Sequence, residues 1–333
     1  MVRLALSLAA WLLATPLVAQ TCTGTDIRDS LSAEQRSGLA EMTAGLTHPE
    51  GNHWRATRGD AVVHLIGTLH VDDPRHDAVM ARIGPVIDSA AALLVEATDE
   101  EEAALQSALA RDPSLIVTTD GPTLPELLTE EEWQRVRAAA AERNIPGVMA
   151  AKFRPWYLTL LLSLPPCMME AMATGMDGLD ARIMDRAAAA GVPTSALEPY
   201  DTLFTLFAAL DVDDQAEMAV ASIPAPGEAE DMFAALLAGY FEERHAEIWT
   251  LAHFMAKEQL DLPPERIDEM FAMLRDVAVT ERNANWIPVI LDAVETAGGP
   301  VVVAAGAAHL SGSDGVLALL EAEGFALERL PFR

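Results

Sequence analysis

Two histidines stand in the same short context near opposite ends of the chain. His70 ends the motif Gly67-Thr-Leu-His, and His309 ends the motif Gly306-Ala-Ala-His. Each motif follows an apolar run typical of a buried strand and precedes a small polar loop and a helical pattern. Open parallel sheets bind ligands at the edge where their strands end. The pattern therefore predicts that the two imidazoles reach a shared crevice.

Glu96 adds a carboxylate to this pair. It lies at the end of the apolar run ALLVEA (92–97), and we expect that strand to lie beside the strand that leads to His70. A carboxylate among apolar residues requires an arginine or a cation as its partner. Two histidines and a glutamate suit a divalent transition metal with open positions for water, and the same side chains could instead form a metal-free acid and base pair. The spacing of these residues does not decide between the two kinds of site.

A structural role is the common alternative for a single histidine after a strand. Two histidines in matching contexts favour chemistry. Ser311 and Ser313 suggest a serine hydrolase, but their segment, SGSDG, lacks the Gly-x-Ser-x-Gly turn of such enzymes. We therefore place the candidate chemistry on the two histidines and Glu96.

The composition is that of a globular protein with ample material for a core. Of the 333 residues, 51% are hydrophobic and 22% are charged, and the formal net charge is -29. Nucleic-acid backbones are held by clusters of Lys and Arg, which this acidic sequence lacks. The charge therefore argues against nucleic acid as a partner, and it does not identify a substrate.

The first residues have the composition of a secretory signal peptide. Arg3 precedes an apolar segment that is too short to span a bilayer, and small residues follow it. We predict that residues 1–19 are removed by cleavage after Ala19. The residues before Cys22 are too polar for a lipoprotein signal, so we expect a periplasmic or secreted protein without a stable membrane anchor.

Cys22 and Cys167 are the two cysteines of the chain. In an oxidising compartment they could form one disulfide across a long loop, which we favour, or remain two partly buried thiols. The chain has no Cys-x-x-Cys pair, so a thiolate zinc site or a redox dithiol is not expected.

Turn residues and periodicity predict an α/β fold with a small sheet built from both chain ends. Near the N-terminus, residues 53–68 are typical of a hairpin with its turn at 58–60, followed by a helix over about 75–89 and a strand at 92–97. Strand, helix and strand form a βαβ unit, whose strands are parallel through a right-handed crossover. Near the C-terminus, residues 300–331 indicate strand, loop, helix and strand.

A large helical middle separates these two parts of the sheet. Helical patterns dominate from about 100 to 295. The apolar segment 156–173 contains two adjacent prolines, so we interpret it as buried helix and not as a membrane span. We expect residues 20–333 to form a single domain with a helical insertion at about 100–295.

Several segments together resemble the TraB/PrgY/GumN family, which includes the Tiki-type metalloproteases. They are GTLH (67–70), LLVEA (93–97), KFRPWYL (152–158), GLDARIMDRAAAAGVPTSALE (178–198), ERNANWIPVI (281–290) and GAAHLSGSDGVLALLEAEGF (306–325). The resemblance covers most of the chain. It implies an EreA/ChaN-like α/β fold and a divalent-metal hydrolase that cleaves peptide or amide bonds in a peptide or small-molecule substrate.

The resemblance also implies a role for each site residue. His70, His309 and Glu96 would bind the metal ion, with Mn, Co or Zn as candidates, and Glu96 could instead be the base for an attacking water. Arg282 would stabilise the oxyanion or orient Glu96. Asn283, on the same helix as Arg282, would orient one of the groups that bind the metal ion.

Three further residues are candidates for substrate binding. Lys152 and Trp156 could bind a substrate carboxylate, although a packed tryptophan is the commoner outcome. Glu198 ends the short strand TSALE and would place another acid at the edge of the sheet.

Two other functions stay open on the sequence alone. The ChaN-like relatives bind haem, and a crevice lined by histidines would suit iron as well. A metal-free esterase resembling the erythromycin esterases would use a histidine as the general base for water.

Overall fold

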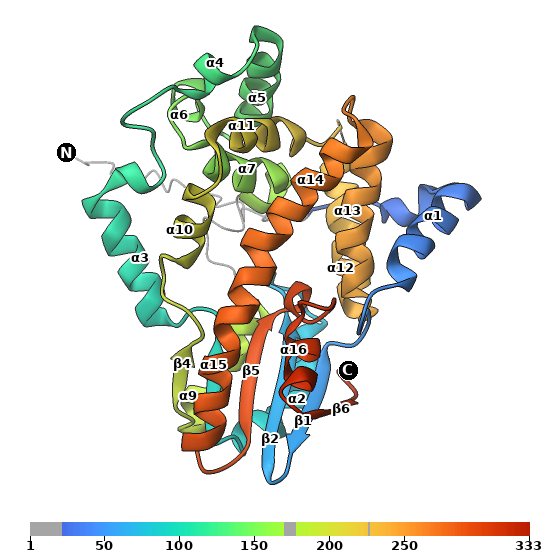
Figure 1. The fold of residues 1–333 in the computed structure, drawn as a ribbon, viewed down its shortest axis with the longest axis vertical. Coiled ribbons are helices and arrows are strands. Elements are labelled where there is room, and N and C mark those ends of the chain that lie inside the picture. Colours follow the sequence, from blue (N-terminus) through green and yellow to red (C-terminus); the bar gives the residue numbers. More distant parts are fainter. Residues whose placement is uncertain (1–21, 170–177, 226) are drawn as a thin grey trace, which may run out of the picture.

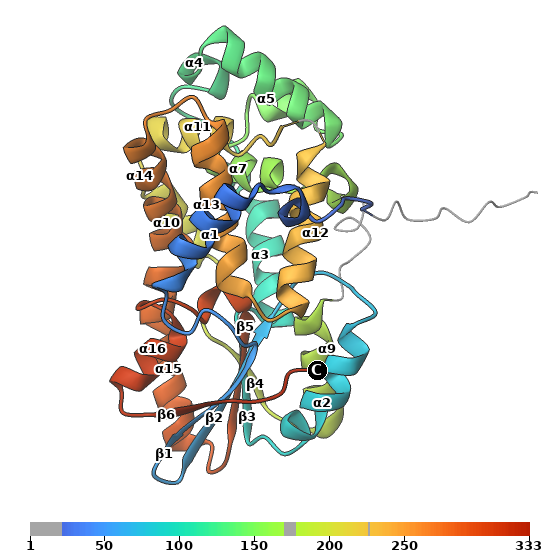
Figure 2. The same ribbon diagram turned by 90° about the vertical axis from the view of Figure 1, so that its right-hand side faces the viewer.

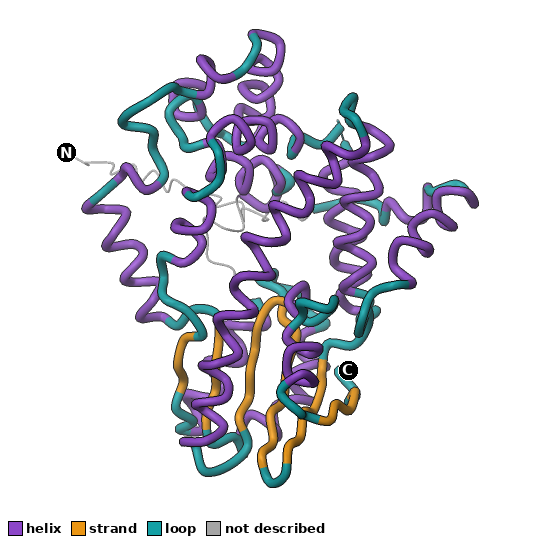
Figure 3. The backbone as a smooth tube through the Cα atoms, viewed as in Figure 1, coloured by secondary structure: helices purple, strands orange, loops and turns teal. Residues whose placement is uncertain are grey.

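The computed structural model describes residues 22–169, 178–225 and 227–333, so the predicted signal peptide lies outside the described residues. A β-sheet forms one end of the molecule, and a group of helices forms the other (Figure 1). Figure 3 shows the strands gathered in the lower half of the view and helices filling the upper half. The predicted α/β fold with a large helical middle is confirmed.

Six strands form one mixed sheet in the order β4-β3-β5-β2-β1-β6. Their bounds are β1 (His53–Arg58), β2 (Ala61–Thr68), β3 (Ala92–Val95), β4 (Thr194–Ala196), β5 (Val301–Gly306) and β6 (Ala326–Arg329). Neighbours among β4, β3, β5 and β2 are parallel, whereas β1 is antiparallel to both β2 and β6. Strands from both ends of the chain therefore share the parallel part of the sheet.

One expected neighbour relation is wrong. We expected the strand that ends at Glu96 to lie beside the strand that leads to His70, but β5 lies between them. Residues 301–305 of β5 are all buried, and a strand that is apolar on both faces belongs in the interior of a parallel sheet. The two strands that precede the histidines are consequently direct neighbours.

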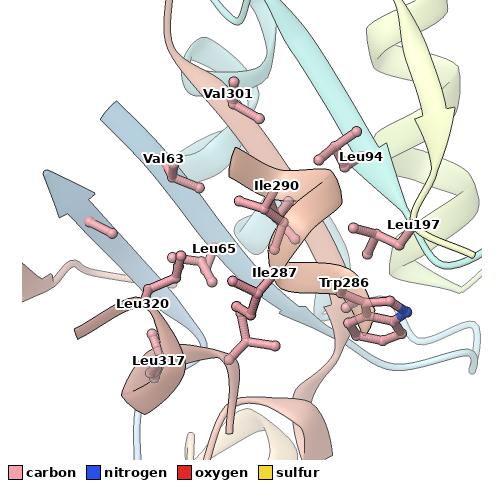
Figure 4. Close-up of a cluster of buried hydrophobic side chains, with 14 of the residues drawn as sticks. Val63, Leu65, Leu94, Leu197, Trp286, Ile287, Ile290, Val301, Leu317 and Leu320 are labelled. Atoms are coloured by element: carbon pink, nitrogen blue, oxygen red, sulfur yellow. The ribbon is translucent and has the colours of Figure 1, made fainter. Parts of the chain in front are cut away.

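Helices cover both faces of the sheet (Figure 2). α2 (His76–Asp88) and α9 (Leu179–Ala190) lie on one face, and α15 (Glu281–Thr296) and α16 (Val316–Ala322) lie on the other. Figure 4 shows apolar side chains of α15 and α16 packed against side chains of β2, β3 and β5. A second buried cluster joins the opposite face of the sheet to α2 and α9. The sheet is therefore fixed from both sides.

Most of the remaining helices form the helical middle. They are α3 (Asp99–Arg111), α4 (Leu124–Leu127), α5 (Glu130–Glu142), α6 (Gly147–Ala150), α7 (Pro155–Ser163), α10 (Thr202–Ala208), α11 (Val212–Ala221), α12 (Glu228–Phe241), α13 (His245–Gln259) and α14 (Pro264–Arg275). α1 (Ala33–Ala44) precedes the sheet and packs against α13. The side chains of Thr129 and Glu132 form a capping box at the start of α5.

α14 and α15 are joined without a break by a π-helical turn, η3 (Asp276–Thr280). The combined helix runs from the helical middle down onto the sheet (Figure 1). A π-turn adds one residue to a helical turn and is frequent at functional sites. This turn lies directly before Arg282 and Asn283.

A disulfide joins Cys22 to Cys167, whose Cα atoms are 5.4 Å apart. The disulfide ties the start of the described chain to the helical middle. The sequence favoured a disulfide over two separate thiols, and this prediction is confirmed. The apolar segment 156–173 begins in α7, and its last residues, 170–173, lie outside the described part. None of the helices described is both long enough and apolar enough to cross a membrane.

Candidate functional site

The two histidine motifs lie side by side at one edge of the sheet. Thr68 of β2 pairs with Gly306 of β5, so both strands end at the same level before the chain leads on to the histidines. β3 ends directly before Glu96, and β4 ends two residues before Glu198. Side chains from four parallel strands therefore leave the same edge, where the first turn of α15 adds an arginine and an asparagine.

Arg282 connects the acidic side chains of the site. Its Nη2 donates to Oε2 of Glu96 and to Oε1 of Glu198, at 2.6 Å each, and its Nε donates to Oε1 of Glu198 at 2.9 Å. Its Nη1 donates to the carbonyl of Ala278 in the π-turn at 3.0 Å. The Arg282 side chain is only 7% exposed. Burial would lower its pKa, but the two carboxylates raise it, so a fixed positive charge lies between two acids.

Glu96 is an anion because its neighbours outweigh its burial. Burial alone would raise the pKa of this carboxyl, whereas the neighbouring His309, Arg282 and His70 side chains lower it to about 2. The backbone N–H of Gly306 donates to Oε1 at 2.6 Å, and Arg282 donates to Oε2. Both carboxylate oxygens therefore have a donor.

His309 is held as a neutral imidazole. Nδ1 lies 2.7 Å from Oδ1 of Asn283, whose amide nitrogen donates to the carbonyls of His309 and Asp314. Since Oδ1 can only accept, Nδ1 carries the proton and Nε2 carries the lone pair. Nη1 of Arg282 lies 3.2 Å from that Nε2. The imidazole packs on the Trp286 ring, and burial lowers its pKa to about 4.

His70 is held as an imidazolium by Asp180. Its Nδ1 lies 2.9 Å from Oδ2 of Asp180, and the Thr68 hydroxyl donates to the other oxygen of that carboxylate. Burial would lower the pKa of His70, but the hydrogen bond and charge of Asp180 raise it to about 9. The side chain is nevertheless 62% exposed. Solvent therefore reaches this imidazole.

The two imidazoles consequently differ in charge at neutral pH. The pKa of His70 is raised to about 9 and that of His309 is lowered to about 4. Pairs of groups whose surroundings separate their pKa values in this way are typical of acid and base catalysis. The edge of the sheet therefore presents one proton donor, one proton acceptor and one permanent cation.

The model of the TraB/PrgY/gumN family matches residues 52–329. The chain belongs to the TraB/PrgY/gumN family. The match includes every strand of the sheet and every residue of the site described above. No curated protein matches the chain.

Asp180 is the site residue of this TraB/PrgY/gumN protein that the sequence did not reveal. It lies in GLDARIMDR, a segment that contributes to the family resemblance. An acid in the first turn of a helix has an ordinary explanation in the helix dipole. Its role is visible only in the structure, where α9 begins against the loop that carries His70. There the backbone N–H of Leu179 donates to the carbonyl of Leu69 at 3.2 Å.

The three candidates for substrate binding lie in different places. Glu198 belongs to the site, where it accepts from Arg282 and, at 2.9 Å, from Nε1 of Trp286. Trp156 is 3% exposed and stacks on Phe207 between α7 and α10, so it packs in the core of the helical middle. Lys152 is exposed and lies near Glu126 of α4. Lys152 and Trp156 are therefore not part of the cluster around Arg282.

The side chains as placed do not fit the expected metal ion. Glu96 has a donor on each oxygen, and the lone pair of His309 faces the Arg282 guanidinium. In the parts of the chain that the structure describes, no group of three His, Cys, Asp or Glu side chains is arranged to hold a metal ion. Arg282, which Glu198 also holds, is the cation that contacts both Glu96 and His309 in this structure.

Proposed function

We propose that this TraB/PrgY/gumN protein is an exported hydrolase that cleaves acyl bonds, either peptide or amide bonds or esters. One observation supports the proposal most strongly. A protonated imidazole, His70, and a neutral imidazole, His309, lie with Arg282 at one edge of the sheet. The disulfide between Cys22 and Cys167 is consistent with export, because such bonds persist in oxidising compartments.

The proposed reaction uses the side chains of the chain alone. The substrate carbonyl oxygen takes the Arg282 Nη1 hydrogen that otherwise points to His309 Nε2, which frees the lone pair of that nitrogen. Water then adds to the carbonyl carbon and gives a proton to Nε2 of His309, and Nη1 donates to the oxyanion that forms on the carbonyl oxygen. His70 then donates its proton to the leaving nitrogen or oxygen as that bond breaks. His309 returns its proton to solvent and His70 regains one, which restores the site.

Glu96 and Glu198 have positioning roles in this proposal. Both carboxylates hold the guanidinium, so the positive charge is in place before the oxyanion forms. Preorganised charge of this kind is usually a large contribution to catalysis, because no reorientation is needed during the reaction.

The test is an assay of the purified protein on fluorogenic peptides, amides and aryl esters. We expect His309→Gln to lower kcat by roughly 100-fold or more. Arg282→Lys should have an effect of about the same size, because an ammonium cannot reproduce the fork of donors. Asn285→Ala, at an exposed position of α15, is the matched control and should leave kcat unchanged. Absence of turnover on every substrate class would overturn the proposal.

Treatment with a chelator distinguishes the proposed reaction from the metal-dependent one. Activity that persists after dialysis against chelator supports the metal-free route. Activity that is lost and then restored by Mn, Co or Zn would overturn that route and establish a metal-dependent hydrolase. A haem-binding protein would instead give a Soret band that disappears in His70→Ala or His309→Ala and would show no turnover.

A further inference from the structure

A cavity of about 480 Å³ lies next to the loop that follows His309. Its walls come from α1 and the residues after it, from α13, α14 and η3, and from loop residues 311–314. The volume is in the range of pockets that bind small molecules. His70, Glu96 and Arg282 do not line this cavity, so it is distinct from the candidate site.

One wall of the cavity is apolar and aromatic. It includes Met42 and Leu46 at the end of α1 and Trp249 of α13. The Arg275 guanidinium already lies over the Trp249 ring, with Cζ 5.9 Å from the ring centre. The electron-rich face of an indole attracts cations, and more strongly than other aromatic rings. Because Arg275 already takes this role, the rest of the wall suits the apolar or aromatic body of a ligand.

The charged residues of the cavity leave one negative charge uncompensated. Arg275 is paired with Asp314, to which its Nε and Nη2 donate at 2.8 and 2.6 Å. Burial lowers the pKa of His253, which bonds to Asp268, so this imidazole is neutral. Asp276 is exposed, and its carboxylate has no hydrogen bond or ion pair with any other residue that the structure describes. A ligand that neutralises Asp276 would be a cation.

Hydrogen bonds connect the wall of the cavity to His309. Asp314, in its wall, accepts from the Thr280 hydroxyl at 2.7 Å, and its backbone carbonyl accepts from Asn283 at 2.8 Å. The same Asn283 side chain fixes the proton on the His309 ring. A ligand that moves the 311–314 loop would consequently alter the surroundings of the imidazole.

We propose that this cavity binds a small organic cation, an amine on an aromatic or alkyl body, and that its occupancy is transmitted to His309. The ammonium group pairs with Asp276, and the body fills the space lined by Trp249, Met42 and Leu46. The connection to His309 runs through Asp314 and Asn283. The proposal does not depend on the hydrolase activity.

Calorimetric titration with three probes of similar shape tests the site. 2-Phenylethylamine should bind with saturation, 2-phenylethanol more weakly, and 3-phenylpropionate most weakly. In Asp276→Asn the affinity for the amine should fall by about threefold or more and approach that for the alcohol, because an exposed ion pair is lost. Trp249→Leu, with its fold checked by circular dichroism, should weaken the amine and the alcohol together.

Asp292→Asn is the matched control, because Asp292 is an exposed aspartate on α15 that does not line the cavity. Equal binding of the three probes to the wild type, or equal weakening by Asp276→Asn and Asp292→Asn, would overturn the site. The imidazole signals of His309, assigned with His309→Gln, should shift with the same midpoint as amine binding. Saturable amine binding without that shift would refute the transmission to His309.

Discussion

His70 carries a positive charge at neutral pH because its Nδ1 forms an ion pair with Asp180. His309 carries no charge, because it is buried beside a guanidinium and its Nδ1–H donates a hydrogen bond to the neutral amide of Asn283. The two residues come from nearly the same motif. Their difference in charge is therefore produced by side chains that lie far away in the sequence.

Asp180→Asn should lower the pKa of His70 from about 9 towards its ordinary value of 6.5. Because the pKa of this histidine is raised by folding, the pair stabilises the folded state fully below about pH 6.5 and loses that effect as the pH rises through about 9. The loss of unfolding free energy in the variant should thus be largest at pH 6 and absent above pH 9.5. An NMR titration of His70 and urea unfolding at several pH values measure both quantities.

Asp185→Asn is the control for this prediction, because Asp185 is exposed on the same helix, α9. It should leave the His70 titration unchanged. An unaltered pKa in Asp180→Asn would mean that another group holds the proton on His70.

At the residue scale, the sequence revealed the atoms of the site better than their arrangement. His70, Glu96 and His309 could be proposed because motif positions and strand ends are local features, and Arg282 and Asn283 followed from the family resemblance. The bond between Arg282 and Glu198 could not, because it joins residues 84 positions apart through a sheet whose strand order was unknown. For the same reason the sequence did not reveal that Arg282 connects Glu96 to Glu198.

At the scale of elements, α9 begins directly against the loop that carries His70. A Cβ atom at Gly178 would lie 2.7 Å from both the His70 Cα and the Leu69 carbonyl oxygen. Only a residue without a side chain permits this approach. The close contact keeps Asp180, in the first turn of the helix, within hydrogen-bond distance of His70.

Gly178→Ala should therefore push the helix and the loop apart. We expect a loss of roughly 1–3 kcal/mol in unfolding free energy, the range for an overpacked position. The pKa of His70 should fall as well, because the distance to Asp180 increases. Gly45→Ala, where a Cβ meets no atom within 4 Å, is the control for thermal and chemical unfolding. Equal stability of the two variants would show that the contact is not constraining.

The local elements followed from the sequence, and the order of the strands did not. The hairpin turn, the helix near 75–89 and the short strand before Glu198 were all predicted from local patterns. The position of β5 between β2 and β3 depends on long-range pairing, which a βαβ pattern leaves open. The π-turn also escaped prediction, because one extra residue hardly disturbs the apolar periodicity of a long helix.

At the scale of the whole molecule, the Cys22–Cys167 disulfide closes a loop between residues 145 positions apart. A link of this length reduces the conformational entropy of the unfolded chain. We expect a reductant, or the pair Cys22→Ser and Cys167→Ser, to lower the unfolding free energy by about 2–5 kcal/mol. Guanidinium unfolding with and without reductant measures the effect. The double variant should not respond to reductant, and a wild type that also fails to respond would contradict the expectation.

The interior strand β5 is synthesised long after the two strands that it separates. β2 and β3 precede residue 100, yet the strand that separates them spans Val301–Gly306. A nascent chain that ends before β5 has nothing to place in that gap, so the sheet cannot close until β5 has been synthesised. The order of the strands thereby makes an early hairpin and an early βα unit wait for a segment that follows the whole helical middle.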